Sequence, residues 1–133
     1  MEELTLRVEA EINPTESEEK VKTAVENMFG NLTTQVKPQR IGNILIAKAK
    51  SREALENFRA ALRRDRVRAA ARKFLYTNQR GNTVAFFLNK QVAFTGHVSF
   101  SQETGESPLG PIKVVVESEN LREIIDWLAP RIA

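Results

Sequence analysis

The residues best suited to chemistry in this sequence are the cations of residues 59–73. That stretch holds seven basic residues against one acid, Asp65. The seven are Arg59, Arg63, Arg64, Arg66, Arg68, Arg72 and Lys73. Planar guanidinium groups bind phosphate oxygens through paired hydrogen bonds, so the stretch favours a surface that binds a polyanion. The alternative is a solvated helix face whose surface ion pairs contribute at most about 1 kcal/mol each.

The rest of the chain supports the first interpretation, because its charge is unevenly distributed. Residues 31–100 hold fourteen basic residues against three acids, a balance of +11, and Arg80 and Lys90 extend this basic region beyond residue 73. Residues 1–30 balance at −5 and residues 101–133 at −3, which gives the net charge of +3. A basic middle between acidic ends is typical of a protein that meets phosphates on one surface.

A polar triplet, Asn89-Lys90-Gln91, interrupts an apolar segment and is a second candidate contact. Side-chain amides can bind base edges or sugars, and a lysine can bind a phosphate. The alternative is that the triplet faces solvent or holds the end of a strand.

Catalysis has no comparable support in the sequence. His97 is the single histidine and there is no cysteine, so a zinc site and a disulfide framework are not expected. No phosphate loop, dinucleotide fingerprint or nucleophile elbow is present. We therefore predict no catalytic residue, no metal site and no cofactor.

Aromatic side chains could stack on bases, but their spacing favours core packing. These are Phe86, Phe87, Phe94 and Phe100. Trp127 lies off the apolar stripe of the last helix, so we expect it at a rim or an interface.

The elements that must position these residues follow from hydrophobic periodicity. Alternating residues predict strands at 4–12, 32–37, 43–49, 83–88, 97–101 and 112–116. Helical spacing predicts helices from Asn13-Pro14 to Gly30, from Ser51 to about residue 75, and over 119–129. The apolar stripe shifts within the second helix, which predicts a kink or break near Arg64-Asp65.

This order predicts one α+β domain spanning residues 1–133. We expect a two-layer sandwich in which helices pack on one face of a mostly antiparallel sheet. The longest apolar run, Val84–Leu88, is far shorter than the roughly 20 residues of a membrane-spanning helix, and we expect a cytoplasmic protein.

Several segments resemble the signature of an archaeal family of uncharacterised proteins. They are Phe87–Phe100, Ser107–Ile112, Asn13–Glu16 and Asp126–Pro130. That family is usually described as an RNA-binding domain, sometimes as a predicted exosome-associated subunit, and it is similar in fold to the ribosomal protein that binds 5S RNA. The resemblance implies a two-layer domain with an RNA-directed surface and supplies no catalytic residue.

Together these observations predict a non-catalytic RNA-binding module in archaeal RNA processing or ribosome-related assembly. The expected RNA contacts are Arg59, Arg63, Arg64, Arg66, Arg68, Arg72, Lys73, Arg80, Asn89, Lys90 and Gln91. The alternative is a protein-interaction or assembly subunit without direct RNA contact, joined to a protein partner or to a second copy of itself.

Overall fold

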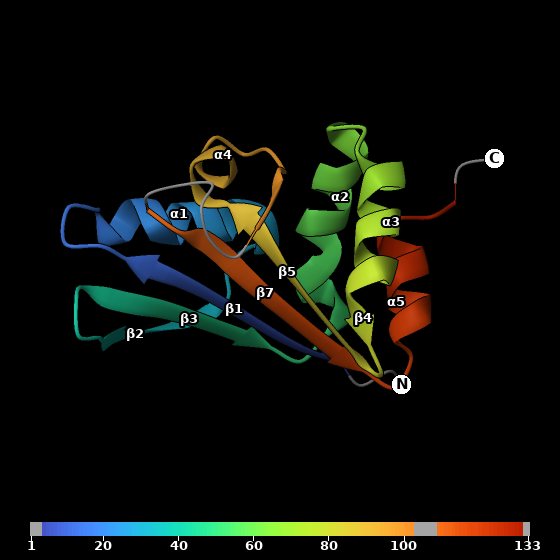
Figure 1. Ribbon diagram of the computed structural model, residues 1–133, viewed down its shortest axis with the longest axis horizontal. Coiled ribbons are helices and arrows are strands. Elements are labelled where there is room, and N and C mark those ends of the chain that lie inside the picture. The colour runs from blue at the N-terminus through green and yellow to red at the C-terminus, as the bar shows by residue number, and fades with distance from the viewer. Residues whose placement is uncertain (1–3, 103–108, 132–133) are drawn as a thin grey trace.

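The fold is described from a computed structural model over residues 4–102 and 109–131. A seven-stranded sheet forms one layer, and the helices form the other layer on one side of it (Figure 1). Every strand pairs antiparallel with its neighbours, in the order β2-β3-β1-β7-β5-β4 with β6 also paired to β5. The predicted α+β sandwich with an antiparallel sheet is confirmed.

The elements follow the predicted order closely. The strands are β1 Leu4–Ile12, β2 Thr33–Pro38, β3 Asn43–Ala49, β4 Gln79–Arg80, β5 Thr83–Asn89, β6 Phe100–Ser101 and β7 Pro111–Ser118. The helices are α1 Glu18–Phe29, a 3-10 turn at Arg52–Leu55, α2 Glu56–Arg64, α3 Arg68–Asn78, α4 Lys90–Phe94 and α5 Leu121–Leu128. Of the turn expected before β7, Ser107 and Pro108 lie outside the described residues.

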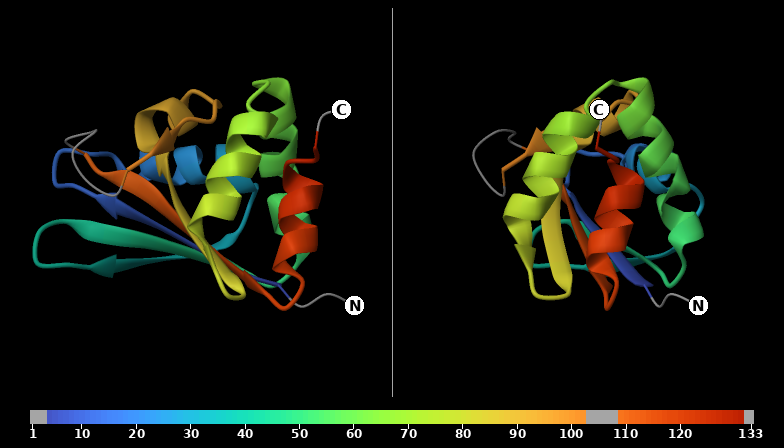
Figure 2. Two further views of the ribbon diagram at one scale, coloured as in Figure 1. Left: turned by 45° about the vertical axis from the view of Figure 1, so that its right-hand side comes forward. Right: turned by 90° about the vertical axis from the view of Figure 1, so that its right-hand side faces the viewer.

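Alternation along the strands separates a covered face of the sheet from an open one. Leu6, Val8 and Ala10 of β1 are fully buried, and their cross-strand partners in β7 are Val116, Val114 and Ile112. The helices cover this face: α1 and α4 lie over one half, and α2, α3 and α5 stand over the other (Figure 2). The core therefore lies between one sheet face and the apolar sides of the helices.

The basic stretch folds as the shifted stripe predicted, in two helices with a break between them. Leu55, Phe58 and Leu62 are fully buried on the first helical segment, and Ala71 and Leu75 on the second. Arg66 sits in the break with a φ of 57°, a conformation uncommon for a residue with a side chain. This break turns the chain so that both helices bury their apolar faces.

Two local predictions are wrong at their boundaries. Helix α1 begins at Glu18 with Ser17 as its N-cap, because Asn13 and Glu16 bond each other: the Asn13 amide N–H donates to Glu16 Oε1 over 3.0 Å. The Asn89-Lys90-Gln91 triplet does not interrupt a strand but begins the short helix α4.

Two of the four phenylalanines predicted to pack in the core lie outside it. Phe86 is buried and Phe100 packs against the core, as expected. Phe87 lies on the open face of β5 and is only half-buried, rather than in the core as predicted. Phe94 is 42% exposed at the end of α4 rather than in the core. No helix in residues 4–102 and 109–131 is long and apolar enough to cross a membrane.

Candidate nucleic-acid interface

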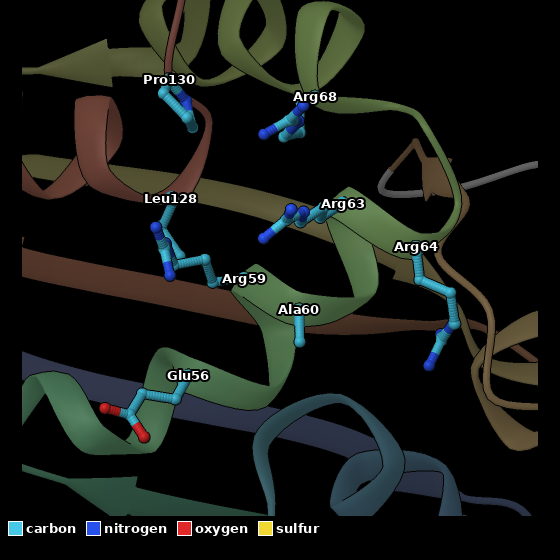
Figure 3. Close-up of a pocket in the computed structure, with 8 residues that line it drawn as sticks. All are labelled: Glu56, Arg59, Ala60, Arg63, Arg64, Arg68, Leu128 and Pro130. Carbon is cyan, nitrogen blue, oxygen red and sulfur yellow. The ribbon is translucent and has the colours of Figure 1, made fainter.

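A pocket of about 410 Å³ lies where the end of α2, the start of α3 and the end of α5 meet. Arg59 and Arg63 project into it from α2 and Arg68 from α3 (Figure 3). Their guanidinium groups point toward the same space, beside the apolar Leu128 and Pro130 (Figure 3). We call this feature the arginine pocket. Its lining residues are Glu56, Arg59, Ala60, Arg63, Arg64, Arg68, Leu128 and Pro130.

The positive charge of this pocket is largely uncompensated. Within the part of the chain that the structure describes, Arg63 and Arg68 make no hydrogen bond or ion pair. Glu56 is the pocket's acid, and its carboxylate points away from Arg63 (Figure 3). Helix α3 starts here with no side-chain cap and no acid in its first turn, so its dipole adds positive potential. The arrangement suits a phosphate group.

Asp65 holds the break that brings the two helices together. Its Oδ2 accepts the Val98 backbone N–H over 2.7 Å, and its Oδ1 lies 3.1 Å from His97 Nδ1. Arg64 Nε donates to Asp65 Oδ1 over 3.2 Å, and Arg64 also donates to the Gly96 carbonyl oxygen. Burial acts to raise the pKa of Asp65, but the hydrogen bonds from Val98, His97 and Arg64 outweigh it and lower that pKa.

Trp127 packs against Arg59 at one edge of the arginine pocket. The guanidinium carbons of Arg52 and Arg59 lie 5.0 and 5.1 Å from the centre of its ring. Arg59 Nε also donates to the Trp127 carbonyl oxygen over 2.9 Å. The expected place of Trp127 at a rim is confirmed, since it is half-buried. Arg59 is therefore held in a fixed position at the pocket's edge.

The Arg72 guanidinium group is bonded to other residues of the protein. Its Nη1 lies 2.6 Å from Asp126 Oδ1 and 3.2 Å from the Ala129 carbonyl oxygen. Tyr76 donates its hydroxyl to the same Asp126 oxygen over 2.7 Å. The Tyr76 hydrogen bond, helped by Arg72, lowers the pKa of Asp126, and burial together with that hydrogen bond raises the pKa of Tyr76.

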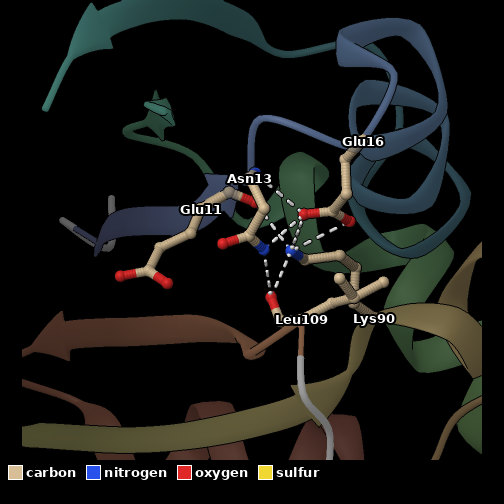
Figure 4. A network of polar contacts seen from close by, with 5 residues as sticks. All are labelled: Glu11, Asn13, Glu16, Lys90 and Leu109. Atoms are coloured by element: carbon tan, nitrogen blue, oxygen red, sulfur yellow. Dashed lines mark hydrogen bonds and ion pairs between the residues drawn. The ribbon is translucent and has the colours of Figure 1, made fainter. Parts of the chain in front are cut away.

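Lys90 is a structural residue, and its prediction as an RNA contact is wrong. Only 3% of the residue is exposed. Its ammonium group donates to the Glu11 carbonyl oxygen over 2.6 Å, to the Leu109 carbonyl oxygen over 2.8 Å and to Glu16 Oε1 over 3.0 Å (Figure 4). These contacts join β1, the start of α1 and the segment before β7. All three donors of the Lys90 ammonium group therefore bond acceptors within the protein, and the buried group cannot reach a phosphate.

Comparison with known proteins places the chain in a family. A family model described as RNA binding matches residues 5–118. The chain belongs to this RNA-binding family. Related proteins are the UPF0201 proteins of Saccharolobus islandicus, 41% identical over 95% of this chain and 87% of theirs, and of Pyrobaculum calidifontis, 43% identical over 95% and 90%. Both relatives come from archaea.

Solved structures share the fold. A UPF0201 protein from Methanococcus jannaschii superimposes with a TM-score of 0.85 at 28% identity, covering 97% of this chain and 95% of that one. A DUF54 protein from Methanothermobacter thermautotrophicus has a TM-score of 0.67 at 18% identity, covering 94% and 99%, and shows the fold alone.

The other residues predicted to contact RNA lie outside the arginine pocket. Arg66 and Lys73 are exposed but do not line the arginine pocket. Arg80 lies at the opposite end of α3, where its Nη1 donates to the carbonyl oxygens of Thr77 and Gln79 over 3.0 and 2.9 Å. Arg59, Arg63, Arg64 and Arg68 come together, and the rest of the predicted set does not.

The polar triplet is divided in the same way. Asn89 caps α4, since its Oδ1 accepts the Val92 N–H over 3.0 Å, and its contact with RNA stays a prediction. Gln91 is exposed and lines a different pocket, between α1 and α4. Among the described residues no cluster of three or more His, Cys, Asp or Glu side chains could hold a metal ion.

Sequence reasoning missed two parts of the site, the partners of Asp65 and the role of Leu128. Asp65 looked like a lone acid among arginines, and only the fold brings His97 and Val98 to it. Leu128 counted as core, and nothing in its spacing indicated that its edge lines a pocket. The signal for Trp127 was present, because its offset from the apolar stripe placed it where arginines could stack on it.

Proposed function

We propose that the chain is a non-catalytic RNA-binding module that holds RNA phosphates in the arginine pocket. The observation that carries this proposal is the convergence of Arg59, Arg63 and Arg68 on one space, with Arg63 and Arg68 unpaired within the described residues. Membership of the RNA-binding family supports RNA as the polyanion. Arg66 and Lys73 extend the charge beyond the pocket.

The process in which the module works is part of the same proposal. The relatives come from archaea, and the resemblance of the sequence implies RNA processing, with exosome association, or ribosome-related assembly. Similarity to the ribosomal protein that binds 5S RNA, also implied by the resemblance, agrees with helices on one face of an antiparallel sheet.

The decisive experiment compares two double variants of equal charge. Arg63→Glu with Arg68→Glu reverses two cations in the pocket, and Lys37→Glu with Lys48→Glu reverses two exposed cations on the β2–β3 hairpin. Filter binding to a labelled single-stranded RNA is measured for both variants over a range of salt concentrations.

The pocket variant is expected to lose binding, and the hairpin variant to keep most of it. With the milder Arg63→Gln and Arg68→Gln, the slope of log affinity against log salt should fall by about 0.7 per lost phosphate contact. Thermal unfolding should stay unchanged for both Glu variants, since neither removes a described contact. Equal losses in the two Glu variants would show that net charge rather than the pocket binds RNA. Undiminished binding by the pocket variant would refute the proposed site.

Arg64 is unsuitable for this test because it also holds the helix break. It donates to Asp65 and to the Gly96 carbonyl oxygen, so reversing its charge would disturb the helix break as well as the pocket. A loss of binding in an Arg64 variant would not separate contact from folding.

A further inference from the structure

A second pocket, of about 420 Å³, lies between α1 and α4 and carries the inference. Thr15, Glu16, Ser17, Lys20, Val21, Ala24, Lys90, Gln91, Phe94 and Leu109 line it. Of the aromatic side chains in the described residues, Phe94 alone is a large exposed apolar group, at 42%. A ring left partly in water beside an apolar-lined hollow is a feature of binding sites rather than of a core.

The backbone that carries this ring is held in place by hydrogen bonds at both ends of α4. Asn27 of α1 donates its side-chain N–H groups to the carbonyl oxygens of Ala93 and Phe94, over 3.1 and 3.0 Å. Asn89 caps the other end of α4, and Lys90 anchors that end to β1. Helix α4 is thus pinned at both ends, so little conformational entropy is lost when something stacks on Phe94.

The chemistry of the pocket suits a nucleobase. Gln91 and Lys20 are exposed at its edge, the first able to bind the polar edge of a base and the second a phosphate. Glu16 also lines the pocket, but its carboxylate is paired with Lys90 over 3.0 Å, so it presents little net negative charge. The walls are formed by Val21 and Ala24 of α1.

The segment that follows α4 contacts one residue of the arginine pocket. Arg64 lines the arginine pocket and donates to the carbonyl oxygen of Gly96, two residues after Phe94. His97, next in the chain, is 61% exposed and contacts Asp65 of the helix break. Figure 1 shows α4 and the α2–α3 connection on the same side of the molecule. Arg64 and His97 therefore lie close to the segment that follows Phe94.

We propose that the pocket between α1 and α4 holds an unpaired base of the RNA whose phosphates occupy the arginine pocket. The inference rests on the proposed function and adds to it the class of RNA: single-stranded, or unpaired within a fold. Bases in a duplex are stacked on one another and cannot reach a side chain such as Phe94, whereas unpaired bases stack readily on aromatic rings.

The test substitutes Phe94 and compares two RNAs. Binding of Phe94→Ala to an unpaired oligonucleotide and to a duplex of the same sequence is measured beside the wild-type protein. Loss of one base–aromatic stack should weaken binding to the unpaired RNA by roughly 5- to 150-fold. The salt slope should not change, because no phosphate contact is lost. Phe94→Trp should bind the unpaired RNA as well as the wild-type protein or better.

The matched control is Ile41→Ala. Ile41 is 71% exposed between β2 and β3 and lines neither pocket, so its substitution removes an exposed apolar group and should leave binding unchanged. Thermal unfolding of Phe94→Ala shows whether the fold survives, and Phe94→Leu, which keeps apolar bulk but loses the ring, gives a second variant.

The outcomes separate this inference from the proposed function. If the wild-type protein binds RNA through Arg63 and Arg68 but Phe94→Ala binds the unpaired RNA equally well, the stacking inference is overturned and the proposed function stands. A duplex bound as tightly as the unpaired RNA would also overturn it. If the wild-type protein binds neither RNA, both fail together.

Discussion

Replacement of Lys90 by methionine separates a structural lysine from an RNA contact. Methionine keeps the unbranched shape of the side chain but removes the ammonium group that bonds Glu11, Glu16 and Leu109. The substitution leaves the Glu16 carboxylate, whose side chain is 10% exposed, without its cation. Breaking a buried ion pair from one side costs about 3–5 kcal/mol.

The expected loss lies near the lower end of that range. Glu16 Oε1 still accepts the Asn13 backbone and side-chain N–H groups, over 3.0 and 2.7 Å. We therefore expect the free energy of unfolding to fall by about 3 kcal/mol. With an unfolding entropy of about 2.1 cal/mol/K per residue, this corresponds to a fall in Tm of roughly 11 °C.

Urea unfolding followed by circular dichroism measures the effect. Gln91→Met is the matched control, because Gln91 is the exposed neighbour and its substitution should change stability by less than about 0.5 kcal/mol. Adding Glu16→Gln to Lys90→Met should restore much of the lost stability, since the buried carboxylate is then neutral while an acceptor for Asn13 remains.

RNA affinity gives the result that would refute this reasoning. At temperatures where the variant is folded, Lys90→Met combined with Glu16→Gln, which leaves no uncompensated carboxylate at the pocket between α1 and α4, should bind RNA as tightly as the wild-type protein. A variant with unchanged stability and lost affinity would show that Lys90 contacts RNA and that the described network does not hold it.

The helix break, the tryptophan and the arginine stacked on it give three further predictions. Because the pKa of Asp65 is lowered from 3.8, its contribution to stability is fully present above pH 3.8 and disappears as the pH falls through the lower folded value. Asp65→Asn should therefore be less stable by about 1–3 kcal/mol at pH 7, and the difference from wild type should shrink in urea titrations below pH 3.8. A constant difference down to pH 2 would contradict the assignment. Trp127, the single tryptophan, stacks on Arg59 at the edge of the arginine pocket, so its fluorescence should change when RNA binds and stay constant in the variant with Arg63→Glu and Arg68→Glu. Arg59→Ala should lower the free energy of unfolding by about 1–2 kcal/mol, from a lost cation–π contact and a lost hydrogen bond.

Periodicity was enough to predict most of the fold. The strands β1, β2 and β3 fall within a residue of their predicted places, and the basic stretch breaks where predicted although α3 ends about three residues later than expected. In each of these helices and strands the apolar residues lie on one face over several turns or several strand positions, so the sequence pattern matches the buried face. The shifted stripe even indicated the break at Asp65, because one straight helix cannot bury two stripes.

Predictions failed for short segments whose structure depends on contacts with other parts of the chain. Asn13-Pro14 has the features of a helix start, yet Asn13 bonds Glu16 and Leu109 instead. The Asn89-Lys90-Gln91 triplet forms a helix because Asn89 caps it and Lys90 is buried among carbonyl oxygens. The carbonyl oxygens that accept from Lys90 lie 19 and 79 residues away in the chain, and no local pattern contains them.

The same dependence on distant partners explains why the sequence predicted a charged surface but not a site. By sequence alone the cations of residues 59–73 are equivalent, whereas the fold gives each a different set of acceptors. Arg72 bonds Asp126, and Arg64 bonds Asp65. Only cations that the fold leaves unpaired, such as Arg63 and Arg68, can bind a phosphate without first breaking a bond within the protein. Their variants should therefore change affinity without changing stability, and variants of Arg72 should do the reverse.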